Sequence, residues 1–219
     1  MYKKYIKRLL DIIISIILII LLLPLFIIMY IITKIEFTGN AIYKQKRIGL
    51  FEKNFTIYKF KTMDDKTKMV TKVSRLIRKI GIDEIPQLFN VLKGDMSLIG
   101  PRPFIVDDPL PSSYKKIRHT VRPGMTGYAQ ISGRVEFTHK KKLEYDYEYV
   151  ENINFFFDLK IFLKTIVYIF KQIFNWYLLN FIEKKRTYVL FSTIYLKNNV
   201  QVINGNGTSD NPYILKLGE

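Results

Sequence analysis

The first 36 residues contain the longest apolar run of the chain. From Ile12 to Ile32 only Ser15, Pro24 and Tyr30 interrupt the run, and an apolar helix of this length can cross a bilayer. No small-residue cleavage site follows it, which argues against a signal peptide. We therefore predict that residues 1–36 form a membrane-embedded helix.

Pro24 and the charges around the run leave two topologies open. Pro24 lies past the middle of the run, where its missing backbone N–H favours a kink. Both flanks are basic, so the charge difference that orients a spanning helix is weak. The helix either spans the membrane or bends at Pro24 and returns to the same side. The basic residues are Lys3, Lys4, Lys7 and Arg8 before the run, and Lys34, Lys44, Lys46 and Arg47 after it.

Beyond this run the pattern changes to short strands and amphipathic helices. Residues 55–62 alternate and are rich in aromatic and β-branched side chains, which predicts a strand. Residues 64–72 are polar and predict a loop or the start of a helix. Residues 73–80 are basic and have helical periodicity. The pattern therefore predicts an α/β protein that is mainly helical and has a few short strands.

A second helix is expected directly after an adjacent pair of carboxylates. Leu88 and Leu92 share a helical face with Ile85, Gly94 is a suitable terminator, and Asp83 is a suitable N-cap. We therefore expect Asp83 and its neighbour Glu84 at a helix N-terminus. The helix dipole there favours carboxylates and also phosphates.

The following segment is punctuated by glycine and proline. Residues 100–103 form a rigid Gly-Pro-Arg-Pro turn, and residues 114–119 are expected to form a short basic helix or strand. Three glycines in residues 121–134 predict a loop that approaches a substrate rather than a core strand. Residues 136–150 are charged and expected to be helical.

Residues 155–179 are largely apolar but carry one polar helical face. That face suits a helix in the membrane interface with its lysines toward anionic headgroups; a core helix with a solvated lysine stripe is the alternative. Its polar residues are Lys160, Lys164, Lys171 and Asn175.

After residue 180 the pattern changes again. Residues 187–196 are β-prone and residues 204–212 are rich in turn residues. A small hairpin in a tail of residues 181–219 is the simplest prediction, and a hairpin of this size needs to dock to be stable.

Charge and composition narrow the partners. Lysine and arginine number 35 against 19 acidic residues, a formal net charge of +16, so we expect an anionic partner: nucleic acid, an anionic membrane or a phosphorylated substrate. The absence of cysteine excludes disulfides and thiolate metal sites. His119 and His139 lack the spacing of zinc ligands and are expected to be surface or hydrogen-bonded residues.

The acid pair can do several kinds of chemistry. Asp83 could be a nucleophile, a general base or a ligand to Mg²⁺, an ion that binds carboxylate and phosphate oxygens together. Two adjacent carboxylates repel, so a cation is needed to keep both ionised. Without further context the pair is an ordinary helix cap. Candidate cations for the pair and for phosphate are Lys59, Lys61, Arg78, Arg102, Arg122 and Arg134.

Five motifs supply that context. They are QKRIG at 45–49, YKFKTM at 58–63, IDEIPQLFNVLKGDMSLIGPRP at 82–103, RPGMTGYAQISGR at 122–134 and DLKI at 158–161. In this order they resemble the bacterial sugar transferase family, the monotopic phosphoglycosyl transferases, over residues 2–174.

The resemblance implies a membrane enzyme. Such an enzyme transfers a sugar 1-phosphate from a UDP-sugar to polyprenyl (undecaprenyl) phosphate, giving the polyprenyl-diphosphate-sugar and UMP. The reaction starts capsule, exopolysaccharide, O-antigen or glycoprotein glycan synthesis at the cytoplasmic face of the bacterial inner membrane. Residues 37–180 would be the catalytic domain, and residues 1–36 a re-entrant helix bent at Pro24.

The resemblance also implies roles for individual residues. Asp83 would be the nucleophile, form a covalent phosphosugar intermediate and contact Mg²⁺, and Glu84 would assist it. Arg102 and Arg134 would bind phosphate, and Asp146 matches an acid near the site.

The chain departs from the family pattern at several positions. Leu23 stands where some members have serine, and Lys61 replaces a usual arginine, which puts bidentate phosphate contact there in doubt. A tryptophan expected after the glycine-rich motif is absent, and Phe137 is its candidate substitute. The tail after residue 181 lies outside the pattern.

Other hypotheses stay open at this point. Asp83 could serve as a metal ligand or base for direct attack by the lipid, and the chain could be a non-catalytic membrane scaffold of a glycan-assembly complex. Nucleic-acid binding would use neither the acid pair nor the anchor. The identity of the sugar and a homo-oligomeric state are undetermined; the loop at 107–113 and the tail are candidates for sugar selectivity.

Overall fold

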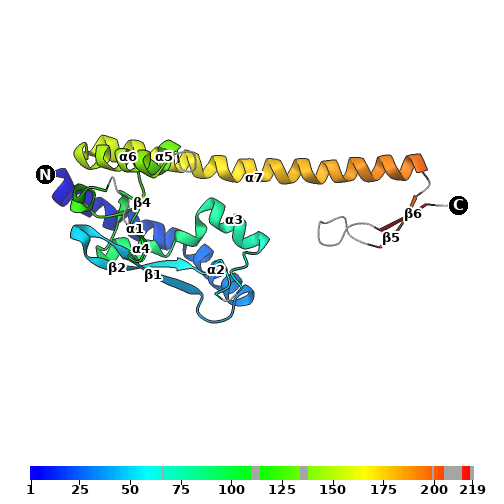
Figure 1. The fold of residues 1–219 in the computed structure, drawn as a ribbon, viewed down its shortest axis with the longest axis horizontal. Coiled ribbons are helices and arrows are strands. Elements are labelled where there is room, and N and C mark those ends of the chain that lie inside the picture. The colour runs from blue at the N-terminus through cyan, green and yellow to red at the C-terminus, as the bar shows by residue number, and fades with distance from the viewer. Residues whose placement is uncertain (66, 110–113, 134–137, 199, 205–213, 218–219) are drawn as a thin grey trace. The chain divides into compact units, whose positions relative to one another are not determined.

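The computed structural model describes residues 1–65, 67–109, 114–133, 138–198, 200–204 and 214–217, and side chains up to residue 178 (Figure 1). Two compact units divide between Ile169 and Phe170. The first unit contains the bent apolar helices, two short sheets and the acid pair. The second contains most of the last helix and a terminal hairpin.

Two helices joined at a sharp bend form the N-terminal segment. A short π-helix, Tyr2–Ile6, leads into α1 (Lys7–Leu21), and α2 (Leu23–Glu36) follows at 64°. Pro24 lies in the first turn of α2, where its missing N–H costs little. The predicted helix break is confirmed. Within the described residues no single helix has the length and apolar content to cross a membrane, but the bent pair together does.

One face of α1 packs into the folded body. Asp11 is buried and accepts hydrogen bonds from the Ser97 hydroxyl at 3.0 Å and from the Leu98 N–H at 2.9 Å. The Arg8 guanidinium donates to the carbonyls of Val91 and Leu92 at 2.6 and 2.9 Å. Thus α1 is also a structural part of the unit that holds the acid pair.

An antiparallel hairpin follows the helices. Strand β1 (Ile42–Ile48) pairs with β2 (Asn54–Phe60), with Ile42 opposite Phe60. A 3₁₀ turn, η2 (Leu50–Glu52), joins them. Strand β2 confirms the prediction for residues 55–62, and the alternation gives the hairpin two faces of different composition.

The acid pair lies between two helices. The loop after β2 leads to α3 (Lys72–Ile80), which ends at Gly81 with φ 85°, and a 3₁₀ turn, η3 (Ile82–Glu84), follows. Helix α4 (Gln87–Lys93) ends at Gly94 in the left-handed conformation, as predicted. The N-cap prediction for Asp83 is wrong, because Pro86 holds that position. A proline is tolerated there, and the acids are held in a turn before the helix.

The glycine-punctuated segment contains a core strand. Strand β3 (Ser97–Ile99) pairs in parallel with β4 (Gly124–Thr126), and α5 (Tyr128–Gly133) follows. A Cβ atom at Gly124 would lie 2.1 Å from the Gly100 nitrogen. The loop prediction for residues 121–134 is therefore wrong over these elements, since the glycines allow two backbones to approach closely.

The remaining elements of the first unit close its core. The 3₁₀ helix η4 (Lys116–Thr120) agrees with the predicted short basic segment, and α6 (His139–Glu151) with the predicted charged helix. Tyr149 of α6 is fully buried, and its hydroxyl donates to the Ile99 carbonyl at 3.1 Å and to Asp158 at 2.7 Å. The largest buried cluster joins α4, β3, α6 and the start of α7; it contains Leu88, Val91, Met96, Ile99, Tyr149 and Ile161.

The C-terminal part differs from its prediction. Helix α7 extends over Phe155–Asn198, and β5 (Val200–Asn204) pairs with β6 (Ile214–Leu217). The terminal hairpin is present, but the β prediction for residues 187–196 is wrong because they continue α7. β-branched residues lower helix propensity only slightly, and extending an existing helix needs no new nucleus. The predicted domain boundary at residue 180 falls within α7.

Candidate active site

The acid pair borders a pocket of about 290 Å³ on one face of the β1–β2 hairpin. Asp83 on η3 is 8% exposed and lines this pocket. The hairpin contributes side chains from alternate positions because every second residue of a strand points to the same side. Most of its lining residues are polar or charged: Tyr43, Gln45, Arg47, Lys59, Lys61, Thr62, Asp65, Arg78, Asp83 and Arg102.

Glu84 joins two of the predicted cations. Its Oε1 atom lies 2.7 Å from Lys59 Nζ and 3.0 Å from Arg102 Nη2. Burial of the Glu84 carboxyl opposes ionisation, but the charges of Arg102 and Lys59 outweigh it and lower the pKa to about 2. Glu84 therefore stays ionised and holds Lys59 and Arg102 in place.

Asp83 has the opposite electrostatic character. Burial and the adjacent charge of Glu84 raise the pKa of Asp83 to about 6, against the opposing effect of Lys59 and Arg78. Among the described residues, Asp83 takes part in no ion pair within 4 Å. It is thus mostly ionised at pH 7 and is not neutralised by a direct partner.

The other predicted pocket residues differ in whether their charged groups already bind other protein groups. Arg78 and the half-exposed Arg102 line the pocket. Lys61 also lines it, but its ammonium donates to the Thr38 carbonyl at 3.0 Å and to Asp65 at 2.6 Å. The Lys61 charge is therefore largely engaged in holding the loop after β2.

Two predicted residues lie elsewhere, and a third is not described. Arg122 does not line the pocket; its Nε donates to the Gly94 carbonyl at 2.8 Å, at the end of α4. Asp146 is buried on α6, 2.8 Å from Arg118 Nε. Arg134 lies outside the described residues, as do Phe137 and positions 110–113 of the proposed selectivity loop.

Asp146 belongs to a neighbouring pocket of about 380 Å³. Arg47 and Arg102 line this pocket as well as that of Asp83, so the two pockets adjoin along these guanidinium groups. Burial and the nearby Arg102 lower the pKa of Arg47. Two close guanidinium groups favour an anion between the pockets.

Sequence reasoning missed Arg47 and Arg118. Arg47 donates to the Pro103 carbonyl at 3.0 Å and to Gln45 at 2.6 Å, and strand alternation with Lys59 and Tyr43 could have indicated it. Arg118 donates to Asp146 and to the Arg102 carbonyl and stacks on Phe104. No sequence signal marks Arg118, because it follows Lys115 and Lys116 in a short basic segment where those two lysines are exposed.

The two histidines need no metal to explain their positions. His119 is buried, its Nδ1 lies 3.0 Å from the Tyr114 hydroxyl, and burial with the Arg118 charge lowers its pKa to about 4. His139 is exposed. Within the described part of the chain, no group of three or more His, Asp or Glu side chains has the geometry of a metal site.

Comparison with known proteins identifies the family. Residues 2–172 match the model of the bacterial sugar transferase family. The chain belongs to this family. The match covers every element from the π-helix before α1 into α7, and so includes both pockets of this sugar transferase, but not β5 or β6.

Several curated relatives carry more specific names. The chain is 43% identical to the uncharacterized sugar transferase EpsL of Bacillus subtilis, over 74% of this chain and 85% of that protein. It is 38% identical to the UDP-N-acetylgalactosamine-undecaprenyl-phosphate N-acetylgalactosaminephosphotransferase of Aeromonas hydrophila, over 74% of this chain and 43% of that protein. It is 33% identical to the UDP-glucose:undecaprenyl-phosphate glucose-1-phosphate transferase of Escherichia coli, over 74% of this chain and 40% of that protein.

These names place the sugar transferase among transferases of substituted phosphate groups. The chain spans less than half the length of the Aeromonas and Escherichia relatives.

Proposed function

We propose that this sugar transferase moves a sugar 1-phosphate from a UDP-sugar to undecaprenyl phosphate, giving undecaprenyl-diphosphate-sugar and UMP. The observation that carries the proposal is the contrast within the acid pair. Asp83 is buried and mostly ionised, and it has no direct ion-pair partner in the described part of the chain; Lys59, Arg78 and Arg102 line its pocket. Such a carboxylate can attack phosphorus, and the cations can bind the phosphate oxygens.

The reaction proceeds in two displacements. An Asp83 oxygen attacks the phosphorus bonded to the sugar, the bond from this phosphorus to the bridging oxygen breaks, and UMP leaves. A phosphate oxygen of the lipid then attacks the same phosphorus, and the Asp83 carboxylate is released. Glu84 keeps Lys59 and Arg102 beside the diphosphate, where they stabilise the charge on the leaving group.

Mg²⁺ is proposed as the cofactor. The donor set fits an ion shared with the substrate: Asp83 supplies a carboxylate, Glu84 is engaged by cations, and Mg²⁺ commonly binds one or two carboxylates together with substrate phosphates. When bound, the ion would neutralise charge on the diphosphate.

The membrane position is proposed to be re-entrant, with the site on the cytoplasmic face. Both ends of the bent helix pair are fastened to the same unit: Lys7 pairs with Asp158 at 2.7 Å, and Glu36 accepts from Ser74 at 2.7 Å. A spanning helix would separate these ends by a bilayer. The outward side chains of α1 and α2 are apolar and exposed, as a lipid-facing surface requires; they include Ile13, Ile16, Ile17, Ile20, Ile27, Ile28 and Ile31.

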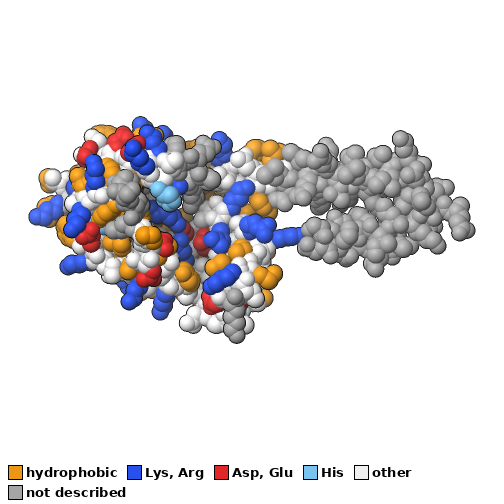
Figure 2. Space-filling model, viewed as in Figure 1, with side chains coloured by type: hydrophobic (Ala, Val, Ile, Leu, Met, Phe, Trp, Pro, Cys, Tyr) orange, Lys and Arg blue, Asp and Glu red, His pale blue; other side chains and the backbone are white. Residues whose placement is uncertain are grey.

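The surface charge agrees with this placement. Lysine and arginine side chains are spread over the face of the first unit that Figure 2 shows. Such a surface attracts anionic lipid headgroups and nucleotide sugars. Helix α7 carries exposed Lys160 and Lys164 beside apolar residues, which supports the proposal of an interfacial helix.

A trapping experiment tests the covalent step. The purified protein is incubated with Mg²⁺ and a panel of labelled UDP-sugars without lipid, and peptide mass spectrometry locates any phosphosugar adduct. We expect an adduct on Asp83, its absence in Asp83→Asn, and wild-type behaviour in Glu151→Gln, an exposed control outside both pockets. UMP release only after undecaprenyl phosphate is added, without an adduct, would favour direct attack by the lipid. Absence of UMP with every sugar would leave the scaffold hypothesis.

A further inference from the structure

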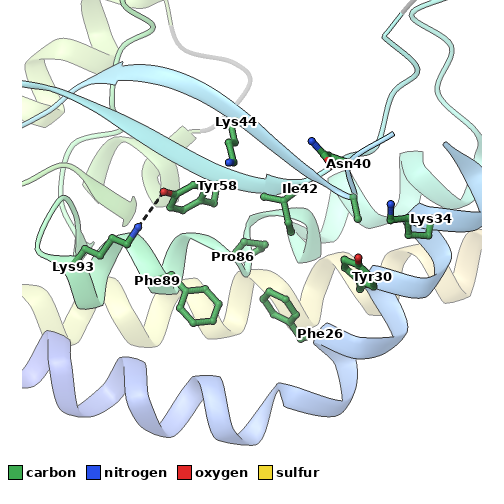
Figure 3. A pocket seen from close by; sticks show the side chains of 11 residues that line it. Phe26, Tyr30, Lys34, Asn40, Ile42, Lys44, Tyr58, Pro86, Phe89 and Lys93 are labelled. Carbon is green, nitrogen blue, oxygen red and sulfur yellow. Dashed lines mark hydrogen bonds between the residues drawn. The ribbon is translucent and has the colours of Figure 1, made fainter. Parts of the chain in front are cut away.

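A larger pocket lies on the opposite face of the β1–β2 hairpin. Its volume is about 500 Å³, and α2, the hairpin and α4 surround it (Figure 3). Strand alternation separates it from the candidate active site: Ile42, Lys44 and Tyr58 line this pocket, whereas Tyr43 and Lys59 line that of Asp83.

The floor of this pocket is aromatic and preformed. Phe26 of α2 and Phe89 of α4 pack edge to face with ring centroids 5.8 Å apart, and Phe26 also packs on Phe60 at 4.8 Å. Figure 3 shows Phe26, Phe89 and Pro86 together on one side of the pocket. Phe89 remains 41% exposed, so the floor offers apolar surface to a ligand.

Lysines surround this floor. Each of three elements presents an apolar or aromatic residue and then a lysine on the same face, four residues on in the helices and two residues on in the strand. In Figure 3, Lys93 and Lys34 lie at opposite ends of the pocket, with Lys44 on its hairpin side. The pairs are Tyr30 and Lys34 on α2, Ile42 and Lys44 on β1, and Phe89 and Lys93 on α4.

The lysines keep donors for an anion. Lys93 donates to the Tyr58 hydroxyl at 3.0 Å and Lys34 to the Gly39 carbonyl at 2.9 Å, but an ammonium has three donors. The eleven residues that line the pocket include no carboxylate. The pocket is therefore positively charged above an apolar floor.

The pocket continues the surface of α2 proposed to face lipid. Ile27, Ile28 and Ile31 are more than half exposed. From Phe26 to Lys34 the helix rises about 12 Å, and its pocket side changes from apolar through a tyrosine hydroxyl to a charge. This order matches the change from acyl chain to phosphate in a phospholipid.

We propose that this pocket binds one anionic membrane phospholipid, its acyl chain on Phe26 and Phe89 and its phosphate on the lysines. The acceptor lipid is a less suitable occupant, because its phosphate has to reach Asp83 on the other face of the hairpin. The proposal rests on the membrane placement of α2 but not on the chemistry of Asp83.

Lipid retention tests the proposal on the full chain. The detergent-purified protein is titrated with phosphatidylglycerol or phosphatidylcholine of the same acyl chains, and native mass spectrometry measures the bound lipid. We expect one phosphatidylglycerol bound in preference to phosphatidylcholine. Lys44→Gln should weaken its binding about five-fold, the loss of one lysine contact near a lipid surface. Lys46→Gln is the matched control, because Lys46 is exposed on the same strand but outside the pocket.

Competing ligands decide between sources of the phosphate. Equal weakening by Lys44→Gln and Lys46→Gln would overturn the proposal in favour of nonspecific attraction, and displacement by inorganic phosphate would exclude a role for the aromatic floor. Displacement by undecaprenyl phosphate, with a raised KM for that acceptor in Lys44→Gln, would reassign the pocket to the acceptor. Asp83→Asn should bind phosphatidylglycerol as the wild type does, so failure of the catalytic proposal is seen separately.

Discussion

At the scale of single residues, two adjacent carboxylates have opposite environments. Glu84 lies against two cations, whereas the Asp83 carboxyl is buried beside the charge of Glu84. The two environments differ because consecutive residues of the 3₁₀ turn η3 point their side chains in different directions and so toward different neighbours. This contrast supports the proposed role of Asp83 as the nucleophile, with Glu84 holding Lys59 and Arg102 beside it.

The fall of the reaction rate at low pH should be set by the ionisation of Asp83. The rate of adduct formation should rise with pH through about 6, because only ionised Asp83 attacks. Glu84 raises this pKa and Arg78 lowers it. Glu84→Gln should therefore move this fall to lower pH and Arg78→Gln to higher pH, beyond any change in maximal rate. Single-turnover rate constants measured from pH 4.5 to pH 8 test this. Below the pKa of Asp83 the rate constant should fall about ten-fold for each pH unit. Shifts in the same direction would contradict the assignment.

The buried pair of Arg118 and Asp146 should contribute strongly to stability. Their side chains are 2% and 7% exposed, so Asp146→Asn leaves an uncompensated buried charge and should lower the free energy of unfolding by about 3–5 kcal/mol. Denaturant titration in detergent measures it. Glu144→Gln on the same helix is the control: it breaks the exposed pair with Lys141 and should cost less than about 0.5 kcal/mol. Similar decreases in the free energy of unfolding for both variants would show that burial does not determine how much each ion pair contributes.

At the scale of elements, the hairpin and the short parallel sheet position the site. Alternation along β1 and β2 places polar and basic side chains on the face of the hairpin toward Asp83. On the opposite face it places apolar side chains and lysines. The close approach of β3 to β4 brings the Gly-Pro-Arg-Pro turn beside the acid pair, so Arg102 reaches Glu84. The two sheets thus act as rigid supports for residues that are far apart in the chain.

The contact between Gly100 and Gly124 can be tested directly. Gly124→Ala would place a Cβ 2.1 Å from a backbone nitrogen, so the strands must separate, and we expect a loss of about 1–3 kcal/mol or more together with lower activity. Gly39→Ala is the comparison: no atom lies within 4 Å there, and only the strain of φ 86° remains, about 1 kcal/mol. Thermal unfolding and adduct formation are measured for both. Equal effects would contradict the close approach of β3 and β4.

At the scale of the first unit, the bent helices α1 and α2 are part of the fold. Arg8 closes the end of α4, Asp11 binds the start of β3, and Glu36 binds residues at the start of α3. These contacts hold α1 and α2 against one body and set their bend. The bent helix pair and the proposed reaction site therefore form one folded unit.

The re-entrant topology is tested with single thiols. The chain has no cysteine, so Lys3→Cys and Ile35→Cys, both at exposed positions, each carry one reactive site. We expect a membrane-impermeant maleimide to label both in inside-out vesicles and neither in sealed spheroplasts. Asp107→Cys reports the side of the catalytic unit. Labelling of Lys3→Cys and Ile35→Cys from opposite sides would establish a spanning helix.

Local features of the sequence were sufficient for several conclusions. The bend near Pro24, the strand at 55–62, the end of α4 at Gly94 and the acid pair depend on a residue's own chemistry and its near neighbours. Lys59 and Arg78 were candidate cations from the sequence itself, and the motif resemblance added a phosphate-binding role for Arg102. All three line the pocket of Asp83. The extent of α7 and strand β4 was missed because both depend on extension or pairing beyond the local window.

The partners of individual charges required the three-dimensional structure. Arg118 and Asp146 are 28 residues apart, Arg122 and Gly94 also 28, and Lys59 and Glu84 25. A lysine or arginine has the same local pattern whether it binds a helix end, a buried acid or a phosphate. Which of these occurs depends on the backbone that packing brings within about 3 Å of it, and that distance is a property of the folded chain.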